Sequence, residues 1–409
     1  MTSQARLALV GGTKTLTTDA PPWPTFDDSD RRALLEVLES RVWGGYHPAV
    51  GELERKFAAF HGAAHGIAIA NGTVSLEIAL QAAGVVAGDE VLVPPITFVA
   101  SAASILRIGA KPVFVDIDPN TLNIDLDKAE AAIVTQSKAG GRVRAIVAVH
   151  FAGLPIDMDR LMKLCDQHGL VLIEDCAHAH GAEWRGRKVG SFGAFGSFSF
   201  QASKNMTSGE GGILIANDPA LVERARSVVN QGRRSGGAWY EHVTLGTNAR
   251  LTGFQAALLL RQLERLPDVM ARKAHSAQRL RAGLAEIGGL VPVPGVVDQG
   301  VTAHGNHLFC VRLDPRAFEG IARDVVVEAL VAEGIPASPG YPRPLYQNQV
   351  FKDHAHVVTP CPVAEEFCRS VFWLTHNVLL GDDRWLDGVL TAIQKVRAGA
   401  DQLRTLARG

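Results

Sequence analysis

The chain has 409 residues and a formal net charge of −1, with 47% apolar and 20% charged residues. This length exceeds that of a single small core and suits a large α/β domain with a smaller partner. The near-neutral charge and the lack of a long basic run argue against a nucleic-acid or anionic-membrane surface. No segment offers the ~20 uninterrupted apolar residues of a membrane span, and the apolar patch at residues 7–10 is too short for a signal peptide. The five cysteines form no C-x-x-C pair. The sequence therefore predicts a cytoplasmic protein with free thiols.

Short apolar runs alternate with helical patterns through the first two thirds of the chain. The runs predict strands, in chain order, at residues 65–71, 90–96, 112–117, 145–151, 171–176, 194–200 and 212–216. Helical patterns lie between them at residues 74–83, 98–107, 125–133 and 158–168. Several of the strands are almost continuously apolar, as strands covered on both faces are. The alternation predicts a mostly parallel, seven-stranded sheet with helices on both sides.

The pattern becomes helical after residue 248. Apolar residues recur at helical spacing in two sets, Leu259, Leu263 and Leu266, then Leu280, Leu284 and Ile287, and Pro267 is expected to interrupt the helix between them. A strand is predicted at residues 305–313 and a helix at 325–333. We therefore expect a boundary near residues 265–290, between a large domain at 1–265, which includes the N-terminal segment, and a small α+β domain at 266–409.

The polar residues that follow each predicted strand are the first candidates for a site, because ligands of open parallel sheets collect beyond the carboxyl ends of the strands. Asn71-Gly72-Thr73 follows the first strand and leads directly into a helix. Free amide donors at a helix N-terminus, together with a glycine and a hydroxyl, suit a phosphate group. The same residues also favour an ordinary N-cap, so this motif alone leaves both interpretations open.

An aromatic and an acid follow the next strands. Phe98, after the second strand, can stack on a planar ring, although a lone Phe is more often core. Asp175 ends the apolar fifth strand, where burial of a carboxylate is costly without a charged or hydrogen-bonding partner. A pyridinium nitrogen is such a partner, and its protonated ring withdraws electrons from an attached carbanion. A carboxylate that caps the next helix is the alternative.

Cys176, His178 and His180 alternate, so on a strand they would share one face that zinc can use. The run lacks a second ligand pair at the usual spacing, and no metal site is predicted.

Lys204 lies on a short loop after the sixth strand, followed by Gly209-Glu210-Gly211-Gly212. A nucleophilic lysine needs a lowered pKa, which burial beside a cationic ring supplies, and Ser199 adds a hydroxyl for a phosphate. A loop lysine is usually solvated. The order of phosphate loop, aromatic, acid and lysine, each at a strand end, favours the catalytic interpretation.

These residues resemble fold-type I pyridoxal-phosphate (PLP) enzymes, and in particular the DegT/StrS-type sugar aminotransferases, from Trp23-Pro24 to about Trp385. The matching stretches are Asn71-Gly72-Thr73, Thr97-Phe98, Ile173-Glu174-Asp175-Cys176-Ala177-His178, the segment from Phe198 to Lys204, and Gly209-Glu210-Gly211-Gly212. Within the family, His61-Gly62-Ala63-Ala64-His65 and the segment from Trp373 to Leu380 look like L-glutamine:scyllo-inosose aminotransferases and 3-amino-5-hydroxybenzoate synthase. Thr375 departs from the family, which often has a proline there.

The resemblance implies a role for each residue. Lys204 would form the internal aldimine with PLP and shuttle the Cα proton, and Asp175 would pair with the pyridine nitrogen. The other cofactor contacts would be His178 near the phenolic oxygen, Phe98 on the ring, and Gly72, Thr73 and Ser199 at the phosphate. Asn248 would reach the phosphate from a neighbouring subunit, which implies a homodimer with shared active sites.

The expected reaction is a ping-pong transamination from glutamine or glutamate to a keto-sugar or keto-cyclitol. Because polar aromatic side chains suit a polyhydroxylated ring, the candidate substrate contacts are Trp43, Tyr46, Tyr341, Tyr346 and His376. A PLP-dependent synthase or dehydratase and a PLP-binding regulatory homologue without turnover are the alternatives. A nicotinamide dehydrogenase is disfavoured, because Gly209 to Gly212 is not a G-x-G-x-x-G motif that opens a helix.

Overall fold

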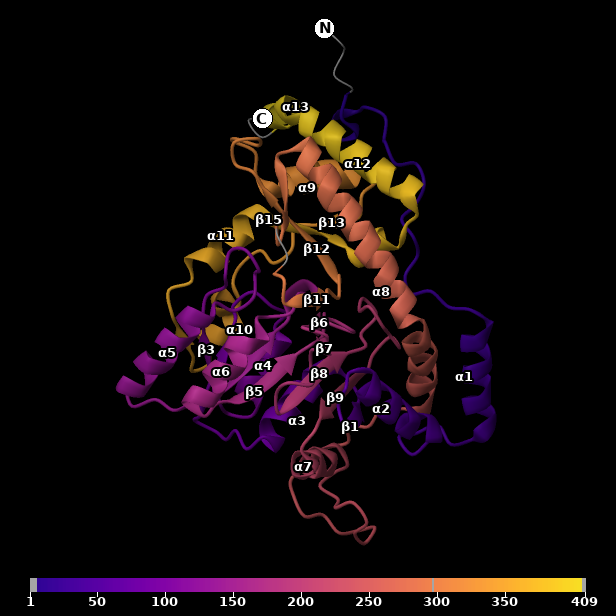
Figure 1. Cartoon of the computed structure of the whole chain (residues 1–409), viewed down its shortest axis with the longest axis vertical. Helices are drawn as coiled ribbons and strands as arrows, with labels where there is room; N and C mark the ends of the chain where they lie inside the picture. The colour runs from indigo at the N-terminus through magenta and orange to yellow at the C-terminus, as the bar shows by residue number, and fades with distance from the viewer. Residues whose placement is uncertain (1–5, 296–297, 407–409) are drawn as a thin grey trace.

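The computed structural model describes residues 6–295 and 298–406, and it has a large lower part and a smaller upper part (Figure 1). The lower part is built on an eight-stranded sheet in the order β1-β9-β8-β5-β4-β2-β3-β14. Its strands are β1 (His65–Ile69), β2 (Glu90–Val93), β3 (Lys111–Phe114), β4 (Val143–Val149), β5 (Val171–Asp175), β8 (Phe195–Ser199), β9 (Gly212–Ala216) and β14 (Val357–Val358).

The predicted α/β fold with a mostly parallel sheet is confirmed. All seven predicted strands are present, and only β9 runs antiparallel to its neighbours β1 and β8. The sheet has one strand more than predicted, because β14 adds to its edge in parallel with β3. Two residues are too few for a periodic pattern, so the sequence carries no signal for this strand.

Helices cover both faces of the central sheet, as Figure 1 shows. One face carries α3 (Gly72–Ala82), α4 (Ala100–Arg107) and α7 (Pro219–Val229), and the other carries α2 (Pro48–Phe60), α5 (Leu126–Lys138), α6 (Met158–His168) and the start of α8 (Gly253–Ile287). Strand β4 explains how one strand serves both cores. Its Ile146 and Ala148 pack with α5 and α6, while Ala145, Val147 and Val149 pack on the opposite side, since successive side chains alternate between faces.

The upper part contains a second, antiparallel sheet in the order β10-β12-β15-β13. Its strands are β10 (Leu290–Val293), β12 (Leu308–Leu313), β13 (Ala337–Ser338) and β15 (Val371–Thr375), and α9 (Arg323–Ala332) and α12 (Asp383–Ala398) pack against it. The remaining elements are α1 (Asp28–Ser40), α10 (Gln349–Lys352), α11 (Pro362–Ser370), α13 (Ala400–Leu406), the 3-10 helices η1 (Ala8–Val10), η2 (Phe151–Gly153), η3 (Leu345–Gln347) and η4 (His376–Leu380), and the small sheet β11 (Val301–Ala303), β6 (Glu183–Trp184) and β7 (Arg187–Lys188). Among the described helices, none combines the length and the low polarity needed to cross a lipid bilayer.

Helix α8 joins the two parts, and here one expectation was wrong. Pro267 does not interrupt the helix, which runs unbroken from Gly253 to Ile287. Proline removes one backbone hydrogen bond and crowds the preceding turn, but packing on both sides of it holds the helix. Leu259, Leu263 and Leu266 pack in the core of the large sheet, and Leu280 and Leu284 pack in that of the small sheet.

The proposed division into residues 1–265 and 266–409 therefore falls inside α8. Leu7 and Leu16 pack in the core of the upper sheet, although the division places them in the large domain. Strand β14 belongs to the large sheet, although the division places it in the small domain. The division stays a proposal.

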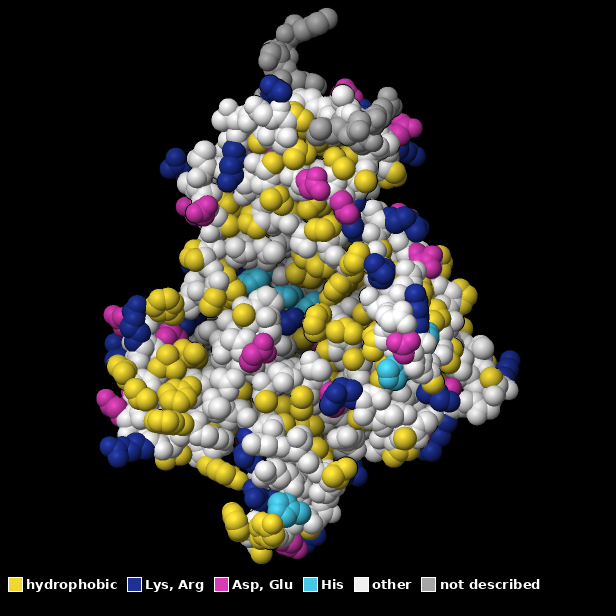
Figure 2. Space-filling view, turned by 180° about the vertical axis from the view of Figure 1, so that it is seen from behind, with side chains coloured by type: hydrophobic (Ala, Val, Ile, Leu, Met, Phe, Trp, Pro, Cys, Tyr) yellow, Lys and Arg dark blue, Asp and Glu magenta, His cyan; other side chains and the backbone are white. Residues whose placement is uncertain are grey.

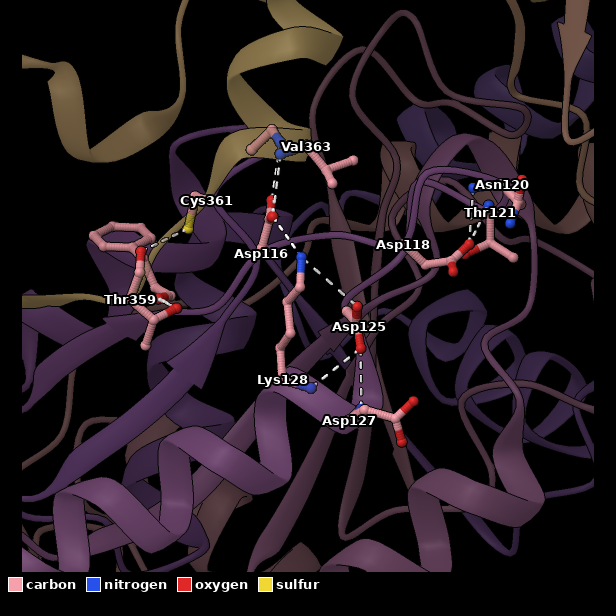
Figure 3. Close-up of polar contacts among 12 residues, drawn as sticks. Asp116, Asp118, Asn120, Thr121, Asp125, Asp127, Lys128, Thr359, Cys361 and Val363 are labelled. Carbon is pink, nitrogen blue, oxygen red and sulfur yellow. Dashed lines mark hydrogen bonds and ion pairs between the residues drawn. The ribbon is translucent and has the colours of Figure 1, made fainter.

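Asp116, just after β3, links the large sheet to α11 (Figure 3). Its buried carboxylate accepts hydrogen bonds from the amides of Val363 and Ala364 in the first turn of α11 and from Lys128 Nζ at 2.7 Å. The carboxylate thereby satisfies free amides at a helix N-terminus from a distant part of the chain. Burial lowers the pKa of Lys128, but its contacts with Asp116 outweigh burial and raise that pKa above the ordinary value.

Candidate active site

A pocket of about 880 Å³ lies at the carboxyl edge of the central sheet. Seven of the predicted site residues line it: Gly72, Thr73, Phe98, Asp175, His178, Ser199 and Lys204. They come from the start of α3 just after β1, the loop after β2, the end of β5 and the loop after it, and the end of β8 and the loop after it. Since neighbouring parallel strands end at the same edge, residues up to 132 positions apart in the chain meet in one cavity.

Asp175 ends β5 at the floor of this pocket and is almost fully buried. Its Oδ2 accepts a hydrogen bond from Ser101 Oγ at 2.7 Å, and its Oδ1 accepts one from the Ala177 amide at 3.1 Å. Ser101 is itself paired with Thr97, with 2.8 Å between the two hydroxyl oxygens. These partners offset part of the cost of burying the carboxylate and fix its orientation toward the pocket.

Lys204 extends into the pocket from the loop after β8. Burial lowers the pKa of its amine to about 8, and the charge of Asp175 opposes that shift. About a tenth of the Lys204 amine is therefore neutral and nucleophilic at pH 7, a far larger share than in a solvated lysine.

The loop after β1 suits a phosphate group. Asn71 caps α3, because its side chain accepts from the Val74 amide at 2.9 Å, while Gly72 and Thr73 begin the helix at the pocket wall. The first amides of a helix have no intrahelical acceptor and attract anions. A Cβ on Gly72 would lie 2.7 Å from the Cβ of Ser199, so only glycine lets the helix start this close to the serine. The cap and the phosphate interpretations are thus compatible, since Asn71 performs the one and Gly72, Thr73 and Ser199 suit the other.

Phe98 and His178 line the same pocket. The Phe98 side chain is 58% exposed, unusual for an aromatic residue at the edge of a core, which fits a surface for a planar ring. His178 is buried, its Nδ1 accepts from the Ala152 amide at 3.3 Å, and its ring lies 4.3 Å from that of His307. Burial first, and then nearby Lys204, lower its pKa far below the ordinary value, so His178 is neutral with its proton on Nε2. Figure 2 shows histidine side chains gathered in a hollow between the upper and lower parts of the molecule.

The residues considered for zinc are arranged differently from the sequence pattern. Cys176 lies within 4.8 Å of His150 and Glu174, a group that does not include His178 and His180. Glu174 accepts hydrogen bonds from the amides of Gly190, Phe192 and Gly193, and His150 Nε2 lies 3.3 Å from it. These contacts fit a structural role of Glu174 in fixing the loop before β8.

Six predicted site residues lie outside the pocket of this chain. Asn248 is exposed next to the end of α7, and Trp43 and Tyr46 are exposed, with Tyr46 in a separate pocket beside Arg250. Tyr341 packs against Trp373, and Tyr346 donates a hydrogen bond to Glu365. His376 is buried beside Lys273. None of these six is among the residues that line the pocket within the described chain, although His376 contacts the pocket residue Ser203 from behind, and their roles stay predictions.

Sequence reasoning missed other residues at the site. Ser101 lies four residues after Thr97, a helical spacing that could have signalled a shared face. Asn205, Lys273 and His307 form a buried group behind Lys204, and no local pattern marks them.

Comparison with known proteins places this geometry in a family. The model of the DegT/DnrJ/EryC1/StrS aminotransferase family matches residues 24–394. The chain is 44% identical to a Streptoalloteichus tenebrarius protein to which an L-glutamine:3-amino-2,3-dideoxy-scyllo-inosose aminotransferase activity is assigned provisionally, over 99% of this chain and 100% of that one. It is 38% identical to the L-glutamine:2-deoxy-scyllo-inosose aminotransferase of Streptomyces kanamyceticus, over 96% and 97% of the two chains.

Among solved structures, 3-amino-5-hydroxybenzoic acid synthase superposes with a TM-score of 0.85 at 35% identity, covering 92% of this chain and 98% of that one. The predicted fold-type I architecture and the PLP cofactor are thereby confirmed at the level of the family. This chain belongs to the DegT/DnrJ/EryC1/StrS aminotransferase family and is a PLP-dependent aminotransferase.

Proposed function

We propose that the enzyme transfers the amino group of L-glutamine to the carbonyl of a keto-cyclitol of the scyllo-inosose type, in the biosynthesis of an aminocyclitol. The observation that carries this proposal is the joint placement of Lys204, Asp175 and the start of α3 in one pocket, in a chain similar to scyllo-inosose aminotransferases over nearly its full length. A keto-sugar acceptor and a glutamate donor are the nearest variants.

The residues divide the work by their chemistry. PLP, when bound, supplies an electron sink for the carbanion at the substrate carbon that carries the amino group. Asp175, oriented by Ser101 and the Ala177 amide, would hold a proton on the ring nitrogen. Gly72, Thr73 and Ser199 would bind the phosphate, and Phe98 would lie against the ring face. Neutral His178 can donate from Nε2 to an oxygen on the ring.

Lys204 would carry the proton. With its pKa near 8, its Nζ can take a proton from the substrate carbon and return it at a neighbouring atom without a large energetic penalty. The polar groups of Gln201, Ser203 and Glu210 also line the pocket and offer donors and acceptors to a polyhydroxylated ring.

The same proposal includes a homodimer. Asn248 is exposed and outside the pocket of its own chain, as a residue that serves a neighbouring subunit would be. The loop between α7 and α8 extends from the body in Figure 1 and exposes Trp239, Tyr240 and Leu245, the last at 95%. Large exposed apolar side chains on one loop favour contact with a second copy. The cytoplasm stays the expected compartment, in keeping with five free, buried cysteines.

The test is incubation of the purified enzyme with L-glutamine and 2-deoxy-scyllo-inosose, followed by mass spectrometry. An amine that keeps all ring hydroxyls supports the proposal. Amine-independent loss of water from the ring would instead support a synthase or dehydratase of the 3-amino-5-hydroxybenzoate synthase kind, and PLP binding without any product would support a regulatory homologue. Lys204→Ala must abolish the product, and Lys128→Met, altered far from the pocket, must retain it.

A further inference from the structure

A buried lysine lies behind the pocket and is not used in the proposed reaction. The Nζ of Lys273, on α8, is fully enclosed and donates to Asn205 Oδ1 at 2.8 Å and to His376 Nδ1 at 2.9 Å. It also lies 5.7 Å from the centre of the Trp23 ring. Within residues 6–295 and 298–406, no carboxylate pairs with it. Burial lowers the pKa of Lys273 well below its ordinary value, because an amine without an anionic partner is costly to bury in its charged form, so a purely structural role explains this lysine poorly.

The contacts of Lys273 lead directly to Lys204. Asn205 is the next residue in the chain, and its Nδ2 donates to the Gly305 carbonyl at 2.6 Å, which fixes Oδ1 toward Lys273. The same Oδ1 lies 3.3 Å from Nδ1 of His307, whose ring lies against that of His178. Through Asn205, Lys273 thereby contacts the backbone just after Lys204 and the pair of His307 and His178, of which His178 lines the pocket.

The other side of Lys204 is held from the same direction. Trp23 Nε1 donates to the Ala202 carbonyl at 3.2 Å, and the His376 ring donates to the backbone carbonyl of Ser203. The rings of Trp23 and His376 meet edge to face at 4.7 Å. The N-terminal segment, α8 and η4 thus converge on residues 202–205, and Lys273 hydrogen-bonds to both Asn205 and His376.

We propose that Lys273 is a positioning residue, which sets the loop of Lys204 through Asn205 and His376 so that the Lys204 amine can reach the cofactor aldehyde. This inference rests on the proposed role of Lys204. Burial first, and then nearby His178 and Lys204, lower the pKa of His307, and burial followed by Lys273 lowers that of His376, so both rings stay neutral and keep fixed hydrogen-bond directions.

The test measures how fast Lys204 bonds to PLP when the cofactor is added to cofactor-free protein. The lysine-linked absorbance is followed in time, and borohydride reduction with peptide mass spectrometry shows that the bond is on Lys204. Lys273→Met keeps the length of the side chain but cannot donate a hydrogen bond. The rate at which Lys204 bonds to PLP should therefore fall by about tenfold or more, as expected for a displaced reactive group. Lys273→Gln keeps a donor and should recover most of the rate.

Two measurements separate positioning from stability. Lys273→Met leaves the buried acceptors Asn205 Oδ1 and His376 Nδ1 without their donor, so its thermal midpoint should fall. Lys128→Met, which loses an ion pair far from the pocket, should lose stability and keep the wild-type rate. A wild-type rate in Lys273→Met would overturn the proposal.

If Lys273→Met does not fold, Asn205→Ala removes the same contact from the other side, and a wild-type rate there would overturn the proposal equally. If the wild-type protein yields no adduct on Lys204, the role given to Lys204 under the proposed function is wrong. If the wild type and Lys273→Met form the adduct on Lys204 at equal rates, only the positioning role of Lys273 is wrong.

Discussion

At the scale of single residues, the chemistry depends on two opposing influences on Lys204. Burial lowers the pKa of its amine, and the carboxylate of Asp175 raises it, which leaves a value of about 8. Asp175 keeps its own geometry through Ser101, a residue 74 positions away in the chain. The charge of Asp175 thus sets how much of the Lys204 side chain is amine and how much is ammonium near neutral pH.

Asp175→Asn should lower the pKa of Lys204 below about 8, by about 1 unit, because only the charge that stabilises the ammonium form is lost. The amine then becomes reactive at lower pH. Reductive methylation of the cofactor-free protein at a series of pH values, with Lys204 quantified by peptide mass spectrometry, measures the midpoint. Asp116→Asn, another buried carboxylate but one outside the pocket, should leave the midpoint unchanged. An upward shift in Asp175→Asn would contradict the electrostatic account.

At the scale of elements, distant residues complete helices that local sequence leaves unfinished. Helix α11 begins at Pro362 after Cys361, which provides no side-chain cap, and Asp116 supplies the acceptors instead. Helix α11 leads directly into β15 and then into η4, which carries His376. The cap therefore fixes the start of α11 on the large sheet.

Asp116→Asn should lower the free energy of unfolding by about 2 kcal/mol. The ion pair with Lys128 is lost, and the side-chain NH₂ that replaces one carboxylate oxygen is a donor facing the donors Lys128 Nζ and the Val363 amide. Chemical denaturation followed by circular dichroism measures the change. The comparison variant is Asp127→Asn, whose exposed pair with Arg160 should be worth less than about 0.5 kcal/mol. Equal losses in the two variants would show that Asp116 does not cap α11 in solution.

At the scale of the whole molecule, α8 joins two cores, and the pocket lies in the lower part while several of its supports come from the upper part. Asn248 and the loop before it are exposed and are not among the residues that line the chain's own pocket. A dimer with shared sites would use both features.

Mixing Lys204→Ala with Asn248→Asp should therefore restore activity that neither variant has alone. In a mixed dimer one site carries both changes and the other carries neither, so random exchange of subunits should recover about a quarter of the wild-type activity. Activity after mixing and subunit exchange, with the mass from light scattering, measures the effect. The absence of recovery in a dimer that exchanges subunits would show that Asn248 serves its own chain.

The sequence by itself determined the elements of the large sheet and most of the pocket. Strands buried on both faces are continuous apolar runs, and the polar residues that follow them must lie at one edge, so Asp175 and Lys204 could be paired without coordinates. Periodicity carries this information because it is local in the chain.

Only the tertiary structure decided which distant residues support that pocket. The contacts of Ser101 with Asp175 and of Lys273 with Asn205 and His376 join residues 74, 68 and 103 positions apart, and no pattern along the chain encodes them. The same reason explains β14 at the sheet edge and the unbroken helix through Pro267, since packing on both sides overrides the local preference of proline.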